Sequence, residues 1–254
     1  MPNLFELTAN PPGLGTGDVA SRVHIRRDLE RRFHELLKNG KNFRFQAYQE
    51  GDLKVFHVQV PSETLPAKTF WWDVVIEVRV SNGTKKSLME NDVKVFSNNP
   101  AFIFTGYAHV SHKGGFLIDW LKDKLPKQSY EQDPSVRNPN SRMGFDKSLW
   151  FAIEWIISGF LYKEDFADWE ELDERNIIRV IDSFQSIFRK YEAASKKHKA
   201  KLAATKRKKK KALEAIRKRA KSTAKPASSV RKVKAAKKVK RVRKVRANKR
   251  KKRR

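Results

Sequence analysis

The stretch FWWDVVIEVRV, residues 70–80, decides the fold class of this chain. Its apolar side chains recur with a period of two, which predicts a β-strand with one face on a core. The face expected to be buried holds Phe70, Trp72, Val74, Ile76, Val78 and Val80. The opposite face, expected to be partly solvated, holds Trp71, Asp73, Val75, Glu77 and Arg79.

Similar patterns flank this strand on both sides. The alternation in residues 43–48 and 53–60, with Glu50-Gly51-Asp52 between them, predicts a hairpin. Residues 92–97 and 102–111 predict two further strands, joined by Asn98-Asn99-Pro100. We therefore expect a mostly antiparallel sheet of about five strands.

Helical patterns surround the predicted sheet. An N-terminal helix is expected from a cap at Ser21 to a stop at Asn39-Gly40. After the sheet, residues 116–125 and 147–162 predict helices, with a loop over 126–144 between them. A last helix is expected from a cap at Asp168, with a stripe that comprises Ile177, Ile181, Phe184, Phe188 and Tyr191. The expected class is α+β, with a helical C-terminal half that extends into a basic tail.

Charge divides the chain sharply near Tyr191. From that residue to Arg254 there are 31 Lys and Arg against two acids, whereas residues 1–190 hold 26 bases and 26 acids. We expect an extended arm over residues 1–20, broken by Pro and Gly, and an α+β domain over 21–191. Residues 192–254 are expected to be a largely disordered or partly helical tail, helical to about residue 220.

Composition excludes several classes of protein and site. The absence of Cys excludes disulfides, cysteine nucleophiles and thiolate metal sites. The N-terminal residues lack the basic and apolar regions of a signal peptide. The most apolar stretch, residues 148–162, falls short of the roughly 20 residues that a membrane-spanning helix needs. We expect a soluble, cytoplasmic protein, with a nucleoid or virion location as alternatives.

The tail predicts a nucleic-acid partner. Lys and Arg at this density bind phosphates and release condensed counterions, and no zinc-finger, RNP or basic-zipper motif accompanies them. We expect sequence-tolerant binding with DNA slightly preferred, no membrane binding, no cofactor and no metal. The residues expected to contact nucleic acid are Lys206, Arg207, Lys208, Lys209, Lys210, Lys211, Arg217, Lys218, Arg219, Arg231, Lys232, Lys237, Lys238, Lys240, Arg241, Arg243, Lys244, Arg246, Lys249, Arg250, Lys251, Lys252, Arg253 and Arg254.

The tail resembles known polycationic tails in composition. Its Lys, Ala, Pro and Val content over residues 196–254 resembles the C-terminal tails of linker histones and of histone-like nucleoid proteins. That resemblance implies condensation or scaffolding of nucleic acid. The segments DVKVFSNNPAFIFTGYAHV (92–110) and VRNPNSRMGFDKS (136–148) resemble uncharacterised phage proteins of no named family. A virion or assembly protein that contacts packaged genome is therefore one alternative, with the body docking a protein partner or a second copy.

One enzymatic alternative rests on the third strand. The element order, with Glu77-Val78-Arg79 on that strand, resembles the restriction-endonuclease-like nucleases, whose two acids hold Mg²⁺ and whose Lys orients water. Asp73, Glu77 and Arg79 would be the catalytic residues of this Mg²⁺-dependent alternative. However, Arg79 replaces the Lys, and both acids lie on the same strand. A solvated sheet face explains the same residues, so a non-enzymatic protein with no catalytic residues is the main expectation.

Two further groups of residues have a functional and a structural explanation. Trp71, Tyr48 and Tyr107 are expected on wetter strand faces, where they could stack on bases or lie under helices. His109 and His112 are three residues apart, and on a strand they would point to opposite faces. We therefore expect these histidines to be surface or structural residues and not a metal pair.

Overall fold

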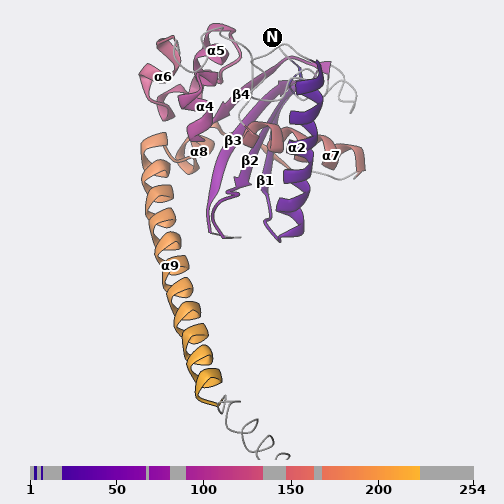
Figure 1. The fold of residues 1–254 in the computed structure, drawn as a ribbon. Helices are drawn as coiled ribbons and strands as arrows, with labels where there is room; N and C mark the ends of the chain where they lie inside the picture. Colours follow the sequence, from indigo (N-terminus) through magenta and orange to yellow (C-terminus); the bar gives the residue numbers. More distant parts are fainter. Residues whose placement is uncertain are drawn as a thin grey trace, which may run out of the picture. The chain divides into compact units, whose positions relative to one another are not determined.

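A computed structural model of the chain confirms the α+β class (Figure 1). A five-stranded sheet carries helices that precede and follow it in the sequence. The structure describes residues 3–4, 7, 19–66, 69–80, 90–133, 147–162 and 168–223.

The sheet is built on an antiparallel meander. Its strand order is β4-β3-β2-β1-β5, in which neighbours are antiparallel except for β5, which pairs parallel to β1. The stretch quoted first forms a central strand, β3, whose register sets Val74 opposite Val58 of β2 and Ser97 of β4. The strands are β1 (Arg44–Glu50), β2 (Leu53–Pro61), β3 (Trp71–Arg79), β4 (Val93–Ser97) and β5 (Trp169–Glu171).

The helices account for most of the remaining described residues. Two of them, α2 and α7, confirm the predicted N-terminal helix and the predicted apolar helix. The predicted cap at Ser21 is wrong, because α2 begins at Val19 and Ser21 lies inside the helix. In chain order they are α2 (Val19–Lys38), α4 (Pro100–Phe104), α5 (Tyr107–Lys113), the 3₁₀ helix η1 (Asp119–Lys124), α6 (Lys127–Glu131), α7 (Lys147–Tyr162), α8 (Glu174–Val180) and α9 (Phe184–Thr223).

The main core lies on the apolar face of β3. All six side chains predicted for that face are buried. Val74, Ile76, Val78 and Val80 belong to the main core, to which α2 and α7 contribute aromatic rings, whereas Phe70 and Trp72 form a second cluster with Leu65 and Ile187. Phe33 of α2 meets Trp150 of α7 edge-on, with ring centroids 6.4 Å apart. Phe43 stacks on Trp155 at 5.1 Å. Aromatic side chains therefore join the two helices to each other and to the start of the sheet.

The opposite sheet face is less solvated than the alternation predicts. Val75 and Asp73 are buried, Glu77 is half-buried and only Arg79 is well exposed. Trp120 of η1 donates its indole N–H to the Glu77 carboxylate at 3.3 Å. Helical segments after the sheet therefore cover the middle of this face, which a period of two cannot indicate.

The predicted fifth strand, residues 102–111, is wrong. This region forms α4 and α5, because Asn99 caps a helix. The Asn99 side-chain oxygen accepts the Ala101 N–H at 2.8 Å, and Pro100 occupies the first helical turn. Asn followed by Pro is a helix start as well as a turn signal, and the structure uses it as a start.

The predicted single helix over residues 168–191 is also wrong. Residues 169–171 form β5, Asp173 caps α8, and residues 181–183 separate α8 from α9. The predicted stripe is nevertheless buried or half-buried along its whole length. The stripe indicated one helix because its side chains are buried or half-buried on both sides of the break, and residues 181–183 contain no Pro or Gly. Two smaller differences are α6, which lies in the predicted loop over 126–144, and η1, which replaces the helix predicted over 116–125.

The chain divides into two units, residues 1–198 and 199–254, with the boundary inside α9. In the first unit, Leu4 and Leu7 of the expected arm are buried in the core. Apart from Asn3, the other residues of the arm up to Asp18 lie outside the described residues, as do residues 224–254.

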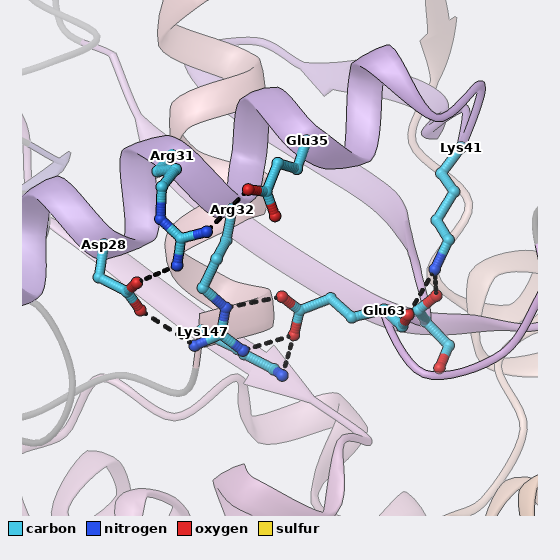
Figure 2. A network of polar contacts seen from close by, with 8 residues as sticks. Asp28, Arg31, Arg32, Glu35, Lys41, Glu63 and Lys147 are labelled. Atoms are coloured by element: carbon cyan, nitrogen blue, oxygen red, sulfur yellow. Dashed lines mark hydrogen bonds and ion pairs between the residues drawn. The ribbon is translucent and has the colours of Figure 1, made fainter. Parts of the chain in front are cut away.

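A partly buried ionic network joins α2, the segment just after β2 and α7 (Figure 2). Arg32 makes two hydrogen bonds to the Glu63 carboxylate, both 2.8 Å, and Lys147 pairs with the same group. Lys41 donates to the Glu63 main-chain oxygen at 2.7 Å. Burial opposes ionisation of Glu63, but the charges and hydrogen bonds of Arg32 and Lys147 outweigh it and hold the pKa of Glu63 below the ordinary value.

Replacement of the shared carboxylate tests this network. Glu63→Gln should lower the free energy of unfolding by about 2 kcal/mol at pH 7, because two half-buried cations lose their partner. Glu35→Gln, which breaks an exposed pair with Arg31, should cost under about 1 kcal/mol. Urea unfolding of the two variants measures this, and equal losses would show that the Glu63 network contributes no more than a surface pair.

Candidate functional site

The basic part of α9 is the first candidate site. Residues 199–217 hold nine Lys and Arg and one acid, Glu214, and every residue in this range is exposed. Within the part of the chain that the structure describes, no base between Lys196 and Arg217 forms an ion pair. Unpaired, exposed cations keep their full capacity to bind phosphate groups.

Six consecutive bases, 206–211, surround the helix. Successive residues are about 100° apart, so these side chains leave no neutral face. Lys206 lies one turn before Lys209 and Lys210, and Arg207 has the same relation to Lys210 and Lys211. Each like-charge pair at this spacing costs roughly 0.2–0.5 kcal/mol of helix stability. Anions that neutralise the pairs are therefore expected to stabilise this segment.

The described residues cover part of the predicted nucleic-acid contacts. Lys206–Lys211 and Arg217 are exposed on α9, as a phosphate contact requires. Lys218 and Arg219 belong to the same helix, but the structure describes only their backbone. The predicted contacts from Arg231 to Arg254 lie outside the described residues.

A buried polar cluster around Asp73 is the second candidate. The Asp73 carboxylate accepts hydrogen bonds from His57 Nε2 at 3.0 Å, Gln59 Nε2 at 2.9 Å and Asn98 Nδ2 at 2.8 Å. Asp73 and His57 are both about 97% buried by side-chain area, at 3% exposure each. Burial opposes ionisation of Asp73, but these three donors outweigh it and hold its pKa below the ordinary value.

The three residues of the nuclease alternative do not converge. Asp73 and Glu77 are four residues apart on one strand, which separates them by about 13 Å. Glu77 bonds Trp120, and Arg79 pairs with Asp52 at 3.2 Å. Among the described residues, no group of three His, Asp or Glu side chains could hold a metal ion. The arrangement therefore gives two separate acids instead of a metal-binding pair.

The remaining candidates have structural partners. His109 and His112 lie on α5 and not on a strand, so a spacing of three puts them on neighbouring positions. His109 Nδ1 bonds the Tyr130 main-chain oxygen at 3.1 Å, and the His112 ring packs against Tyr130. Tyr48 and Tyr107 are buried. Trp71 alone of the three proposed stacking residues is partly exposed.

Sequence reasoning missed the partners of Asp73. His57, Gln59 and Asn98 come from β2 and from the segment after β4, and the strand register brings them together. Gln59 lies directly opposite Asp73, which a correct hairpin register would have shown. Sequence reasoning also missed a cavity of about 300 Å³ beside Glu63 and Lys147, which Tyr191 and Phe188 line as well.

Comparisons with known proteins add no relative. No family model, no curated protein and no solved structure matches the chain. None of the helices in the described part of the chain is long and apolar enough to cross a membrane.

A change of one tail charge tests the repulsion within α9. Lys206→Glu turns two repulsive pairs into attractive ones, with Glu N-terminal to Lys, the better orientation. Amide exchange of residues 206–211 should slow by about threefold at low salt and converge with wild type at high salt. The same charge change at exposed Lys113 should leave these amides unaffected. A salt-independent effect would contradict the electrostatic explanation.

The pH dependence of stability tests the Asp73 cluster. A lowered folded pKa means that Asp73 contributes stability above its unfolded pKa, about 4, and loses it as pH falls through the folded value. Asp73→Asn should lower the free energy of unfolding by about 3 kcal/mol at pH 7. Below about pH 4, this variant should lose less stability than the wild-type protein does. Asp123→Asn, at an exposed position, should lose stability at acid pH in the same way as the wild-type protein. Urea unfolding from pH 2 to 7 measures both variants, and parallel curves would refute this role of Asp73.

Proposed function

We propose that this protein binds nucleic acid without sequence preference, through the basic part of α9 and the bases that follow it. The observation that carries the proposal is the run of exposed Lys and Arg on α9 that lack ion-pair partners among the described residues. Phosphate groups are the abundant partner for such a run, because each contact releases a counterion. Such contacts position a protein on nucleic acid and do not identify bases.

Duplex DNA is the partner that fits this charge density best. It carries about one negative charge per 1.7 Å of helix axis, so several bases on one helix meet phosphates at once. A membrane surface is a weaker match, because residues 199–217 have bases all round and only three large apolar side chains. Those three are Leu202, Leu213 and Ile216.

The body supports a non-enzymatic role in this proposal. Its acids and bases balance, so residues 1–190 do not attract phosphate by net charge. The separated positions of Asp73 and Glu77 give the nuclease alternative no support. In this proposal the body is a docking surface for a protein partner or a second copy, in a nucleoid or a packaged genome. Particles that co-purify with the full chain would favour the virion role over free nucleoid binding.

A matched pair of charge variants tests the proposal. Lys206→Gln, Lys208→Gln and Lys210→Gln together should weaken binding to a random duplex and reduce the slope of log K against log salt by up to about 2.7. The control replaces three exposed bases of the body, Lys38→Gln, Lys113→Gln and Lys127→Gln, with the same loss of charge.

Filter binding at several salt concentrations and on two unrelated duplex sequences gives the slopes. The control slope should match wild type, and the two sequences should bind equally. The proposal fails if both triple variants lose the same slope, because net charge and not α9 would then govern binding.

A further inference from the structure

The cavity beside Glu63 and Lys147 is a candidate ligand site in the body. Segments far apart in the sequence converge on it: the end of β2 and the chain after it, the start of α4, the start of α7 and the first turns of α9. Its volume of about 300 Å³ is at the lower end of the range for small-molecule sites. An apolar cavity of about 150 Å³ already accepts a benzene ring, so this cavity has room for one ring and a short polar group.

Lys147 gives this cavity a cation with unused donors. Its ammonium group pairs with Glu63, and no second partner contacts it among the described residues. An ammonium group has three N–H donors, so two of them stay free. The Lys147 side chain is 35% exposed, which allows a ligand in the cavity to reach it.

The charge balance around Lys147 favours an anion. Glu63 also lines the cavity, but each of its carboxylate oxygens already accepts a hydrogen bond from Arg32 (Figure 2). The seven charged residues labelled in Figure 2 comprise four cations and three acids, a surplus of one positive charge. Among these four cations, Lys147 is the one that lines the cavity. A ligand with a single negative charge would balance the surplus.

A chain of hydroxyl groups adds a further donor beside Lys147. The Thr64 hydroxyl lies 3.3 Å from the Ser62 hydroxyl and 3.1 Å from the Tyr191 hydroxyl. Three hydroxyl groups that share two hydrogen bonds keep one O–H proton free. When Ser62 donates to Thr64 and Thr64 donates to Tyr191, the free proton belongs to Tyr191, which is partly exposed. Because Glu63 and Thr64 are neighbours in the chain, their partners Lys147 and Tyr191 approach the same part of the cavity.

Aromatic side chains form the apolar wall of the cavity. The Tyr191 ring packs against Trp72, with centroids 5.0 Å apart, and the Phe188 ring stacks on Phe184 at 5.3 Å. These contacts hold the rings in place before a ligand binds, which lowers the entropy cost of binding. Phe188 and Pro100 are partly exposed, so an aromatic ring of a ligand can lie against them.

We propose that this cavity binds a small aromatic monocarboxylate. The carboxylate would accept hydrogen bonds from the free N–H donors of Lys147 and from the Tyr191 hydroxyl. The ring would lie against Phe188 and Pro100. Since Tyr191 and Phe188 belong to α9, the ligand would join the start of this helix to α7 in the body.

Two other classes of ligand fit the same cavity less well. A phosphate monoester carries a second negative charge, which would face the Glu63 carboxylate, and phosphate sites collect several charged donors. An organic cation could stack on the aromatic wall, but the free donors and the positive surplus around Lys147 would repel it. Both classes are therefore useful comparison ligands.

Phenylacetate and its neutral isostere phenylacetamide test the proposal on the full chain. With about 10 non-hydrogen atoms, phenylacetate should bind with a millimolar dissociation constant, followed through NMR shifts of the Trp72 and Tyr191 rings. Phenylacetamide should bind at least about tenfold more weakly, because it loses the charged hydrogen bond to Lys147. Salt at about 0.15 M screens the exposed bases of α9, and the ring signals report on the cavity and not on the tail.

Substitutions of opposite sign separate a binding role from a structural one. Lys147→Gln should weaken phenylacetate binding about tenfold, and Tyr191→Phe, which removes one hydroxyl, about threefold. Glu63→Gln should strengthen binding several-fold, because it removes a negative charge beside the ligand. The control is Lys113→Gln, at an exposed position of the body, which has the same loss of charge as Lys147→Gln and should bind as wild type does.

Four results would overturn the proposal. The first is no saturable phenylacetate binding up to about 30 mM, well above the expected range. The second is equal binding of phenylacetate and phenylacetamide. The third is an equal loss in Lys147→Gln and Lys113→Gln, or a loss of affinity in Glu63→Gln. The fourth is tighter binding of phenyl phosphate or phenethylamine than of phenylacetate at the same ring signals, which would identify a phosphate or a cation site. None of these results bears on the binding of duplex DNA by the tail, so the two proposals fail independently.

Discussion

The buried carboxylate of Asp73 is the constraint around which the body is organised. A buried charge must be matched by hydrogen bonds, and Asp73 takes them from His57, Gln59 and Asn98. Asn98 also approaches the Asp182 main-chain oxygen, at 3.4 Å, just before α9 begins. One charge therefore fixes the register of β2 on β3, the exit from β4 and the entry into α9.

Charge is partitioned between two parts of the chain for physical reasons. The body uses its charges in pairs, as the Glu63 network with Arg32 and Lys147 shows, and its bases and acids are equal in number. Residues 199–217 have only three large apolar side chains to bury and one acid to pair with. The helix there is consequently exposed on all sides. Such a segment gains stability from an external polyanion and not from the fold.

Much of this architecture follows from the sequence, and its exceptions have specific causes. The alternation in residues 70–80 and the apolar helix 147–162 predicted their elements correctly, because burial imposes period and length. Asn99-Pro100 was misjudged because the same pair starts turns and helices. β5 is only three residues long and carries no strand pattern of its own. The Asp73 cluster was missed because pairing register, which brings Gln59 opposite Asp73, is a non-local property.

The central claim is that affinity for nucleic acid resides in the exposed bases of α9 and the residues after it. Hydroxyl-radical footprinting of the full chain, free and bound to duplex DNA, tests it most directly. The account predicts that protection appears at oxidisable side chains such as Leu202, Leu213 and Ile216, which are exposed in the free protein. Exposed side chains of the body, such as Leu37, should react equally in both states. Protection confined to the body, with these α9 side chains unchanged, would contradict the account.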